Sequence, residues 1–284
     1  MLWYNTIMKY QILDDKIIIE KHEDFNIKQI LESGQIFRFG CADGVWWCAS
    51  GDKFAKLYEQ GDACVIETLD PEYFVNFFDL KTEYFAIKTE LAKDKFMAEV
   101  ISKCPGIRIL KREKLDTIIE FIISANNNIS RIKKIVEKLC ALAGEKKEWG
   151  YAFPTKEALL KLSIEDFNSL GAGYRGNYLY QAVQQLKNVD IEALGLMPTT
   201  KLKNYLIGLS GIGPKVANCI LLFGFSRVEC FPVDTWIEKV YREHFHGKLQ
   251  SRDKITKYFE AKFGKKSGIA QQYLFYAKRE NIIK

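Results

Sequence analysis

A lysine and an aspartate nineteen positions apart are the two side chains best suited to covalent chemistry. Lys215 follows Pro214 in the segment GIGPKVANCI, so it falls in the first turn of an expected helix. The helix dipole disfavours an ammonium ion there, and partial desolvation adds to this effect, so the uncharged amine that a nucleophile requires is favoured. Asp234, in the segment CFPVD, could supply a carboxylate that stabilises positive charge or moves a proton.

A purely structural role is also consistent with the position of Asp234. A helix is expected to begin near Asp234 or Thr235, and aspartate is a good N-cap. Thr235 and Glu238, however, have the spacing of a capping box of their own. If Thr235 caps the helix, the Asp234 carboxylate is left to point elsewhere.

Lys215 is expected to lie at the start of the second helix of a helix-hairpin-helix at about residues 200–224. In LIGLSGIGPKVANCILLFGF, one helix ends, a Gly211-x-Gly213 turn follows, and Pro214 takes a favourable first helical position. The two glycines allow a phosphate to approach closely, and the N–H groups that open the next helix favour an anion. A bare turn between two helices is the alternative interpretation, because a single G-x-G pattern is common.

Helical spacing divides the residues near Lys215 into two groups. Val216, Ile220 and Phe223 form an apolar stripe, whereas Cys219 lies one turn beyond Lys215 on the same face. Cys219 therefore either faces the same site as Lys215 or is a small buried filler. The spacing is consistent with both roles.

The composition is that of a globular protein large enough to bury a substantial core. Of the 284 residues, 48% are hydrophobic and 27% charged, which excludes disordered and fibrous classes. The formal net charge of +6 is compatible with a polyanionic partner. The seven cysteines include no C-x-x-C pair and indicate neither a disulfide framework nor a zinc site. With no export signal and no long apolar stretch, we expect a cytoplasmic protein without a membrane span.

Two kinds of pattern divide the chain. Residues 9–68 predict an antiparallel meander, with turn signals at Asp43-Gly44, Gly51-Asp52 and Gly61-Asp62 between the β-type runs KIIIEKH, QIFRF, VWWCA, KFAKLYE and ACVIETL. From Asp70 onward the periodicity is helical. We therefore predict the α+β class, with a small antiparallel β-rich N-terminal domain and its flanking helices at residues 1–103. A mostly helical body follows at residues 104–284.

The string LSGIGPKVANCI followed by FPVD resembles the signature of the helix-hairpin-helix base-excision DNA glycosylase superfamily, in its lysine-bearing, bifunctional form. No cysteine follows Cys230, so the C-terminal iron-sulfur loop of the endonuclease III and adenine glycosylase branches is missing. The chain is therefore similar to the 8-oxoguanine DNA glycosylase branch, from about Phe25 to Arg279.

This resemblance implies a set of base-binding residues. The segment SGQIFR, residues 33–38, matches a family segment whose glycine carbonyl, here that of Gly34, accepts the hydrogen that only the oxidised base carries on N7. In GIAQQYLF, residues 268–275, Gln271 would contact the Watson–Crick edge of the base and Phe275 would stack on it. Those two residues are four apart and share a helix face. Cys219 would cover the opposite face of the base.

The resemblance also implies DNA contacts. The loop NNNISR would fill the gap left by the flipped base, and GYR would place a tyrosine in the stack and an arginine on the opposite cytosine. Trp236 departs from the pattern, because some relatives carry a phosphate-binding histidine there. The implied contacts come from Asn126, Asn127, Asn128, Arg131, Tyr174, Arg175, Gly211, Gly213 and Val216.

The activity implied by the resemblance is that of a bifunctional DNA repair glycosylase and AP lyase. It would excise 8-oxoguanine, preferably opposite cytosine, by base flipping and Schiff-base chemistry at Lys215 with Asp234 as partner. The expected partner is double-stranded DNA containing oxidised guanine, bound by a monomer without a cofactor. A structural cation could be held by the backbone carbonyls of Ile207, Leu209 and Ile212. The alternatives are a glycosylase for other damaged purines and a non-catalytic helix-hairpin-helix DNA-binding protein.

Overall fold

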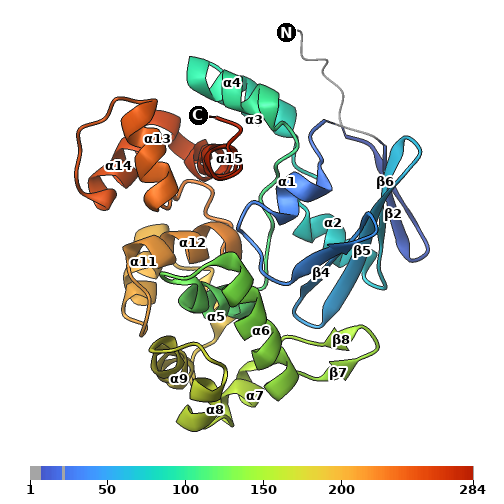
Figure 1. Cartoon of the computed structure of the whole chain (residues 1–284), viewed down its shortest axis with the longest axis vertical. Coiled ribbons are helices and arrows are strands. Elements are labelled where there is room, and N and C mark those ends of the chain that lie inside the picture. Colours follow the sequence, from blue (N-terminus) through green and yellow to red (C-terminus); the bar gives the residue numbers. More distant parts are fainter. Residues whose placement is uncertain (1–7, 21–22, 284) are drawn as a thin grey trace. The chain divides into compact units, whose positions relative to one another are not determined.

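Figure 1 shows the computed structural model of the chain, in which residues 8–20 and 23–283 are described. The first seven residues of the predicted N-terminal domain lie outside the described residues. Two compact units are present. The first comprises Met1–Cys48, Ala55–Lys111 and Phe231–Lys284, and the second comprises Ala49–Phe54 and Arg112–Cys230. The C-terminal segment thus belongs to the same unit as most of the N-terminal part. The predicted domain boundary at residue 103 does not anticipate this grouping, and the boundary stays a prediction.

The N-terminal part contains a six-stranded antiparallel sheet and the rest of the chain is mostly helical, which confirms the predicted α+β class. The strands run in the order β1-β2-β6-β5-β4-β3. The simple meander was therefore wrong in part: β3 to β6 are consecutive neighbours, but β2 pairs with β6. The bounds are β1 (Tyr10–Leu13), β2 (Lys16–Glu20), β3 (Phe39–Ala42), β4 (Val45–Ser50), β5 (Lys53–Gln60) and β6 (Ala63–Glu67).

The predicted strand QIFRF is also wrong, because β3 begins only at Phe39. Its residues are buried nonetheless, and the Gln35 side chain bonds the backbone of Arg108 and Leu110 in place of a neighbouring strand. The Gln35 amide donates to the Arg108 carbonyl at 2.8 Å, and its oxygen accepts from the Leu110 N–H at 2.8 Å. A buried backbone needs such partners, and here one side chain supplies two of them.

Buried apolar side chains from the sheet and from two helices, α1 (Ile27–Leu31) and α2 (Pro71–Phe77), form the core of the first unit. Figure 1 shows both helices beside the sheet. β2 alternates buried and half-buried positions, so its inward face is apolar. The remaining helices of this unit are α3 (Tyr84–Leu91), α4 (Lys95–Lys103), α13 (Thr235–Glu243), α14 (Arg252–Phe263) and α15 (Ser267–Arg279), with the 3-10 turn η1 (Gly264–Lys266). α15 is buried along most of its length and packs against α4, α13 and α14.

The second unit is built around α5 (Lys114–Ser124), which packs against α6 (Ile129–Ala143), α9 (Arg175–Gln185) and α12 (Pro214–Gly224). Phe121 of α5 stacks on Phe223 of α12, with ring centroids 5.5 Å apart. The predicted helix-hairpin-helix is confirmed as α11 (Thr199–Ile207) followed by α12. The smaller elements are β7 (Lys146–Lys147), β8 (Gly150–Tyr151), α7 (Lys156–Leu160), α8 (Ile164–Ser169) and α10 (Ile191–Leu194). In the part of the chain that the structure describes, no helix has the length and hydropathy needed to cross a bilayer.

A buried carboxyl group links the β4–β5 turn to α5 inside the second unit. The Gly51 N–H donates to Asp116 Oδ2 at 2.7 Å, and the Phe153 N–H donates to the Gly51 carbonyl at 2.7 Å. One turn along α5, Glu120 pairs with Arg112 at 2.6 Å, and both of these side chains are fully buried. Burial, with the nearby charge of Glu120 adding to it, raises the pKa of Asp116 to about 7.

This raised pKa predicts a pH-dependent stability that Asp116→Asn should remove. The folded-state pKa of Asp116 lies above its ordinary value of 3.8, so the folded protein holds an extra proton between about pH 4 and pH 7. Its contribution to stability is complete below pH 4 and is lost as the pH rises through about 7. At about 1.4 kcal/mol per pKa unit, the full change is on the order of 4 kcal/mol.

The measurement is urea unfolding of the parent protein and of Asp116→Asn at several pH values from 4.5 to 8. The amide oxygen of the variant can still accept from the Gly51 N–H. The free energy of unfolding of the variant should therefore increase relative to that of the parent as the pH rises. If the free energies of unfolding of the two proteins changed in parallel with pH, burial would not be holding the Asp116 carboxyl group protonated.

Candidate active site

The turn between α11 and α12 uses its two glycines for different reasons. Gly211 has a φ of +82°, and a Cβ atom there would lie 2.8 Å from Tyr178 Cβ and 3.1 Å from Ile122 Cγ2. The fold itself therefore requires Gly211. Gly213 has an ordinary φ of −91°, and a Cβ atom would meet nothing within 4 Å. The missing side chain at Gly213 leaves open space beside the N-terminal N–H groups of α12, where an anion would be favoured.

Two glutamines of α9 hold this turn in place. Ser210 Oγ donates to Gln181 Oε1 at 2.9 Å, and the Ser210 N–H donates to Gln185 Oε1 at 2.8 Å. Gln185 Nε2 donates in turn to the Gly208 carbonyl at 3.2 Å. Sequence reasoning missed both glutamines, because a polar residue on an exposed helix face carries no signal of a tertiary partner.

Lys215 lies in the first turn of α12, directly after Pro214 at the first helical position, as predicted. It is half-buried, and its Nζ lies 5.8 Å from the centroid of the Phe121 ring. The aromatic face partly desolvates the amine on one side. Cys219 is 4% exposed and lies one turn further along α12, so both interpretations of that cysteine stand. Val216 is 6% exposed, so a DNA contact from this residue would use its backbone N–H.

Asp234 is the N-cap of α13, and the capping box predicted from Thr235 and Glu238 is wrong. The Asp234 Oδ1 accepts the N–H groups of Trp236 and Ile237, both at 3.0 Å. Thr235 is already the first helical residue, and Glu238 pairs with Arg252 instead. Aspartate is the stronger cap, which explains why the helix begins one residue earlier. Both capping bonds use the same oxygen, so the cap orients the carboxylate through one of its two oxygens.

In the first unit, the fold brings Gly34 beside α15. Gly34 has a φ of +76°, and a Cβ atom there would lie 2.9 Å from Phe275 Cε1. Gln271 and Phe275 share a face of α15 as expected; Gln271 is buried and accepts from Gln272 Nε2 at 2.9 Å. Two of the three predicted base-binding residues of this unit, Gly34 and Phe275, are therefore adjacent, although their positions in the sequence are far apart.

The three asparagines each have a structural role in the loop between α5 and α6. Asn126 adopts a left-handed φ of +50°, and Asn127 Nδ2 donates to the Ile123 carbonyl at 3.0 Å. Asn128 is the N-cap of α6, and its Oδ1 accepts the Arg131 N–H at 2.9 Å. These bonds leave other donor and acceptor positions of the asparagines available, so the predicted DNA contacts stay predictions.

The two arginines expected at the opposite base differ in their surroundings. Arg175 is 3% exposed, and its guanidinium donates to the carbonyls of Ala125 and Asn126, each at 2.6 Å. Arg175 therefore braces the asparagine loop from within. Arg131 is exposed and donates from Nη2 to the Gly171 carbonyl at 2.9 Å. Tyr174, the predicted wedge, is 56% exposed.

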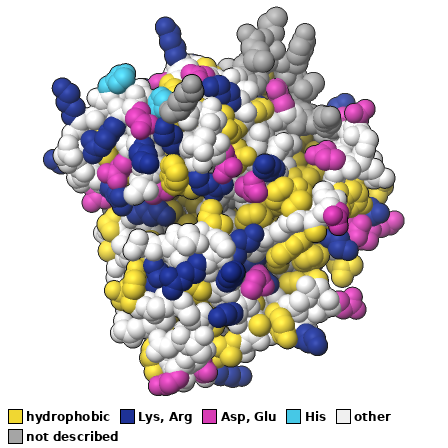
Figure 2. Space-filling view, viewed as in Figure 1, with side chains coloured by type: hydrophobic (Ala, Val, Ile, Leu, Met, Phe, Trp, Pro, Cys, Tyr) yellow, Lys and Arg dark blue, Asp and Glu magenta, His cyan; other side chains and the backbone are white. Residues whose placement is uncertain are grey.

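A surplus of basic side chains covers α13, α14 and the loop between them. From Thr235 to Lys266 the sequence has nine Lys or Arg against four Asp or Glu, which accounts for most of the net charge of +6. Figure 2 shows these dark blue side chains gathered over this part of the molecule. Lys248, Lys254 and Lys257 are exposed and form no ion pair with a residue that the structure describes. Lys239 lies over the Trp236 ring, 5.0 Å from its centroid.

A groove of about 1090 Å³ in the second unit lies away from the predicted site residues. Asp116, Glu145, Lys156 and Glu192 contribute to its walls, and Lys215 does not. Within residues 8–20 and 23–283, no group of three or more His, Cys, Asp or Glu side chains could hold a metal ion. All seven cysteines are free, and Cys41 is the exposed one.

Comparisons with known proteins show the family to which the chain is similar. Residues 16–118 match the family described as "8-oxoguanine DNA glycosylase, N-terminal domain". The Clostridium acetobutylicum 8-oxoguanine glycosylase/lyase, in a crystal structure with dsDNA containing cytosine opposite to 8-oxoG, is 34% identical with a TM-score of 0.91. That match covers 98% of this chain and 99% of the other. The "Probable N-glycosylase/DNA lyase" of Methanothermobacter thermautotrophicus is 28% identical over 232 residues, which are 72% of this chain and 74% of that protein.

The yeast protein "N-glycosylase/DNA lyase" of Saccharomyces cerevisiae is 29% identical over 227 residues, which are 72% of this chain and 59% of the yeast protein. Residues 119–265, about half of the chain, match the family described as "HhH-GPD superfamily base excision DNA repair protein". The chain therefore belongs to the HhH-GPD superfamily of base excision DNA repair proteins, in its 8-oxoguanine DNA glycosylase branch.

Proposed function

We propose that this protein excises 8-oxoguanine from duplex DNA and then cleaves the strand at the resulting abasic site. One observation carries the proposal: a half-buried lysine occupies the first turn of α12, beside the open space at Gly213. The hairpin places backbone N–H groups for a phosphate, and the lysine adds an amine nucleophile next to them. A non-catalytic DNA-binding hairpin could use the same side chain only as a cation for a phosphate, so the test is whether the amine forms a covalent bond.

The reaction begins when the neutral Lys215 amine attacks C1′ of the flipped nucleotide. The bond from C1′ to N9 breaks, its electron pair leaves with the base, and the departing base takes up a proton in balance with the one that the amine loses. Ring opening gives a Schiff base between Lys215 and C1′. Loss of a C2′ proton then expels the 3′ phosphate by β-elimination. Asp234 stabilises the positive charge that develops on the sugar, with its carboxylate oriented through the Oδ1 bonds to α13.

Recognition of the damaged base falls to Gly34, Gln271, Phe275 and Cys219. The Gly34 carbonyl accepts the N7 hydrogen of the oxidised base, and Phe275 stacks on the ring. The left-handed backbone at Gly34 and the contact of this residue with the Phe275 ring support this assignment. An unoxidised guanine has a lone pair at N7 and would leave the carbonyl without a donor.

The opposite cytosine is read by Arg131, while Arg175 shapes the loop that fills the gap. The exposure of Arg131 and its bond to the Gly171 carbonyl leave further N–H donors on its guanidinium. The internal bonds of Arg175 to Ala125 and Asn126 favour a bracing role over a direct one. The exposed Tyr174 remains the proposed wedge in the base stack.

The chemistry requires no redox or organic cofactor, and the hairpin could hold one structural cation. The three backbone carbonyls of Ile207, Leu209 and Ile212 offer the oxygen ligands that a hard cation prefers. The Leu209 carbonyl accepts from the Ile212 N–H at 3.2 Å, which brings two of these residues together. A cation there would bridge the hairpin to a phosphate. The free cysteines are consistent with a cytoplasmic setting.

Borohydride trapping on a duplex with 8-oxoguanine opposite cytosine tests the proposed function. The parent protein should form a covalent adduct, because reduction fixes the Schiff base. Lys215→Gln should form none and should excise the base at less than about a thousandth of the parental rate. Lys201→Gln, which removes an exposed lysine from α11, is the matched control and should behave as the parent. Absence of an adduct with the parent would favour the non-catalytic alternative.

The two hairpin glycines should respond differently to alanine. Gly211→Ala should lower the free energy of unfolding by about 2 kcal/mol, because it adds strain at a positive φ and a clash with Tyr178. Gly213→Ala should leave stability nearly unchanged and weaken duplex binding by about tenfold, because the methyl group obstructs a phosphate. Thermal unfolding and fluorescence anisotropy at one ionic strength measure the two effects. Equal duplex binding by Gly213→Ala and the parent would contradict a phosphate contact at the hairpin.

Opposite-base preference should depend on Arg131. Arg131→Ala should reduce the preference for cytosine over adenine by about tenfold in single-turnover excision, since one good polar contact contributes roughly 1–3 kcal/mol. Lys134→Ala, an exposed residue one turn along α6, removes the same charge and should weaken both substrates equally. Arg175→Ala should instead destabilise the fold. An unchanged ratio for Arg131→Ala would assign that arginine to phosphate binding alone.

A further inference from the structure

Arg279 connects the two parts of the first unit to which base recognition is assigned. It is the last residue of α15 and lies four positions after Phe275, so both residues are on one helix face. The Arg279 guanidinium carbon lies 5.4 Å from the centroid of the Phe275 ring. Its Nη2 also donates to the carbonyl of Glu32, the C-cap residue of α1, which precedes Gly34 by two positions.

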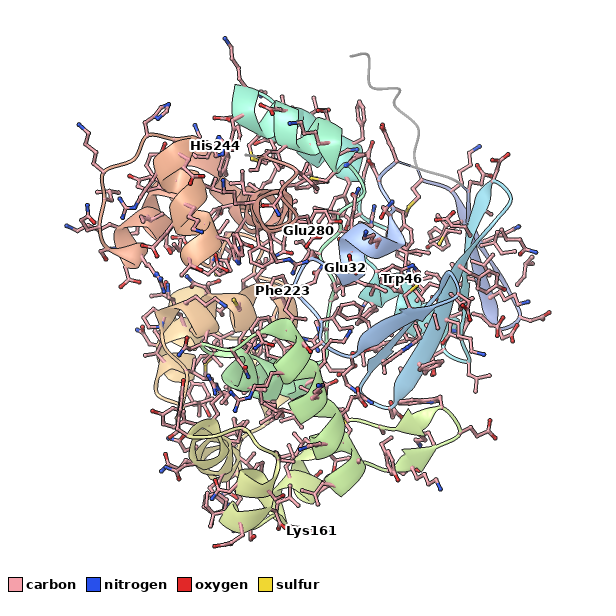
Figure 3. All side chains as sticks on the ribbon, viewed as in Figure 1. Glu32, Trp46, Lys161, Phe223, His244 and Glu280 are labelled. Atoms are coloured by element: carbon pink, nitrogen blue, oxygen red, sulfur yellow. The ribbon has the colours of Figure 1, made fainter. Side chains whose placement is uncertain are left out.

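The guanidinium is anchored on a second side by Glu280. Arg279 Nε donates to Glu280 Oε1 at 2.9 Å, and the Arg279 side chain is only 14% exposed. Figure 3 labels the two acidic residues that flank it, Glu32 and Glu280. A planar guanidinium with bonds in two directions has little freedom to rotate. Its orientation over the Phe275 ring is therefore fixed by the protein.

The third nitrogen of this guanidinium is the unusual one. Arg279 Nη1 is buried and has no hydrogen-bond partner among the residues that the structure describes. A Cβ atom built on Gly34 would lie 3.5 Å from Nη1 and 2.9 Å from Phe275 Cε1. The buried N–H donor and the ring edge thus approach the same side of the glycine. Leaving a buried cationic donor without a partner is costly, so such an arrangement is expected where a ligand supplies the acceptor.

We propose that Arg279 contacts the flipped base directly and also positions Phe275 and Gly34 for its recognition. It holds the Phe275 ring by a cation–π contact, ties the turn that carries Gly34 to the end of α15, and presents Nη1 to an acceptor on the incoming base. This inference rests on the proposed function, and it assigns the residue that keeps Gly34 and Phe275 in a fixed relation. Arg279 therefore affects which base is recognised and does not affect the reactivity of Lys215.

Two substrates separate this role from a merely structural one. A duplex with 8-oxoguanine opposite cytosine requires base recognition before Lys215 can act, whereas a duplex with a ready-made abasic site presents no base. Arg279→Met keeps the length of the side chain and removes the guanidinium. It should lower single-turnover excision of 8-oxoguanine by about tenfold or more, and it should leave cleavage of the abasic duplex within about twofold of the parent.

Two further variants provide the controls. Lys278→Met removes the neighbouring charge, which pairs with Glu243, and should match the parent on both substrates. Arg279→Lys keeps a cation near the ring but loses the planar fork, so it should restore part of the excision rate lost in Arg279→Met. Melting temperatures of all four proteins show whether each variant folds.

The outcomes divide clearly. Selective loss of excision in Arg279→Met, with partial rescue by Arg279→Lys, supports the positioning role. Equal excision by Arg279→Met and the parent overturns it, and so does a parallel fall on both substrates. A parent protein that cleaves the abasic duplex but leaves 8-oxoguanine in place would contradict the proposed function itself, which is a distinct result.

Discussion

The left-handed backbone at Gly211 is the constraint on which the hairpin and its lysine depend. This conformation reverses the chain between α11 and α12, and the packing of Tyr178 and Ile122 against it leaves no room for a side chain. The reversal fixes where α12 begins, and hence where Lys215 and the free N–H groups lie. The bonds that Ser210 donates to Gln181 and Gln185 hold the turn against α9. Gly211, which has no reactive side chain, thus determines the position of Lys215, which has one.

Capping and chemistry are combined in single residues at several points of this protein. Asp234 caps α13 through Oδ1, Asn128 caps α6, and both residues are assigned to the reaction or to DNA. A side chain that caps a helix is held in one rotamer by one or two backbone bonds, so its remaining polar atoms are already oriented. Helix termini therefore provide rigid supports for polar groups that would otherwise move freely.

The sequence predicted the parts of this structure that follow from local patterns. The hairpin, the first-turn position of Lys215 and the turns at Asp43-Gly44 and Gly61-Asp62 depend on residues close together in the chain, and all are present. The pairing of β2 with β6 and the buried path of residues 35–38 depend on distant partners, so periodicity could not show them. The capping box failed because Asp234 competes with Thr235 for the same helix end. The site residues came from a resemblance to a family, and spacing alone left most of them as turns or core.

The first unit is assembled from segments that are separated in the sequence by Arg112–Cys230, most of the second unit. α4 presents the apolar residues Met97, Val100 and Ile101, and these are buried where α15, made some 160 residues later, packs against α4. Closing so long a loop is slow, because its entropy is lost before the contacts form. During synthesis the chain therefore carries an uncovered apolar face on α4 until α15 leaves the ribosome. A cell that makes this protein has to keep that nascent surface from aggregating until α15 is available to cover it.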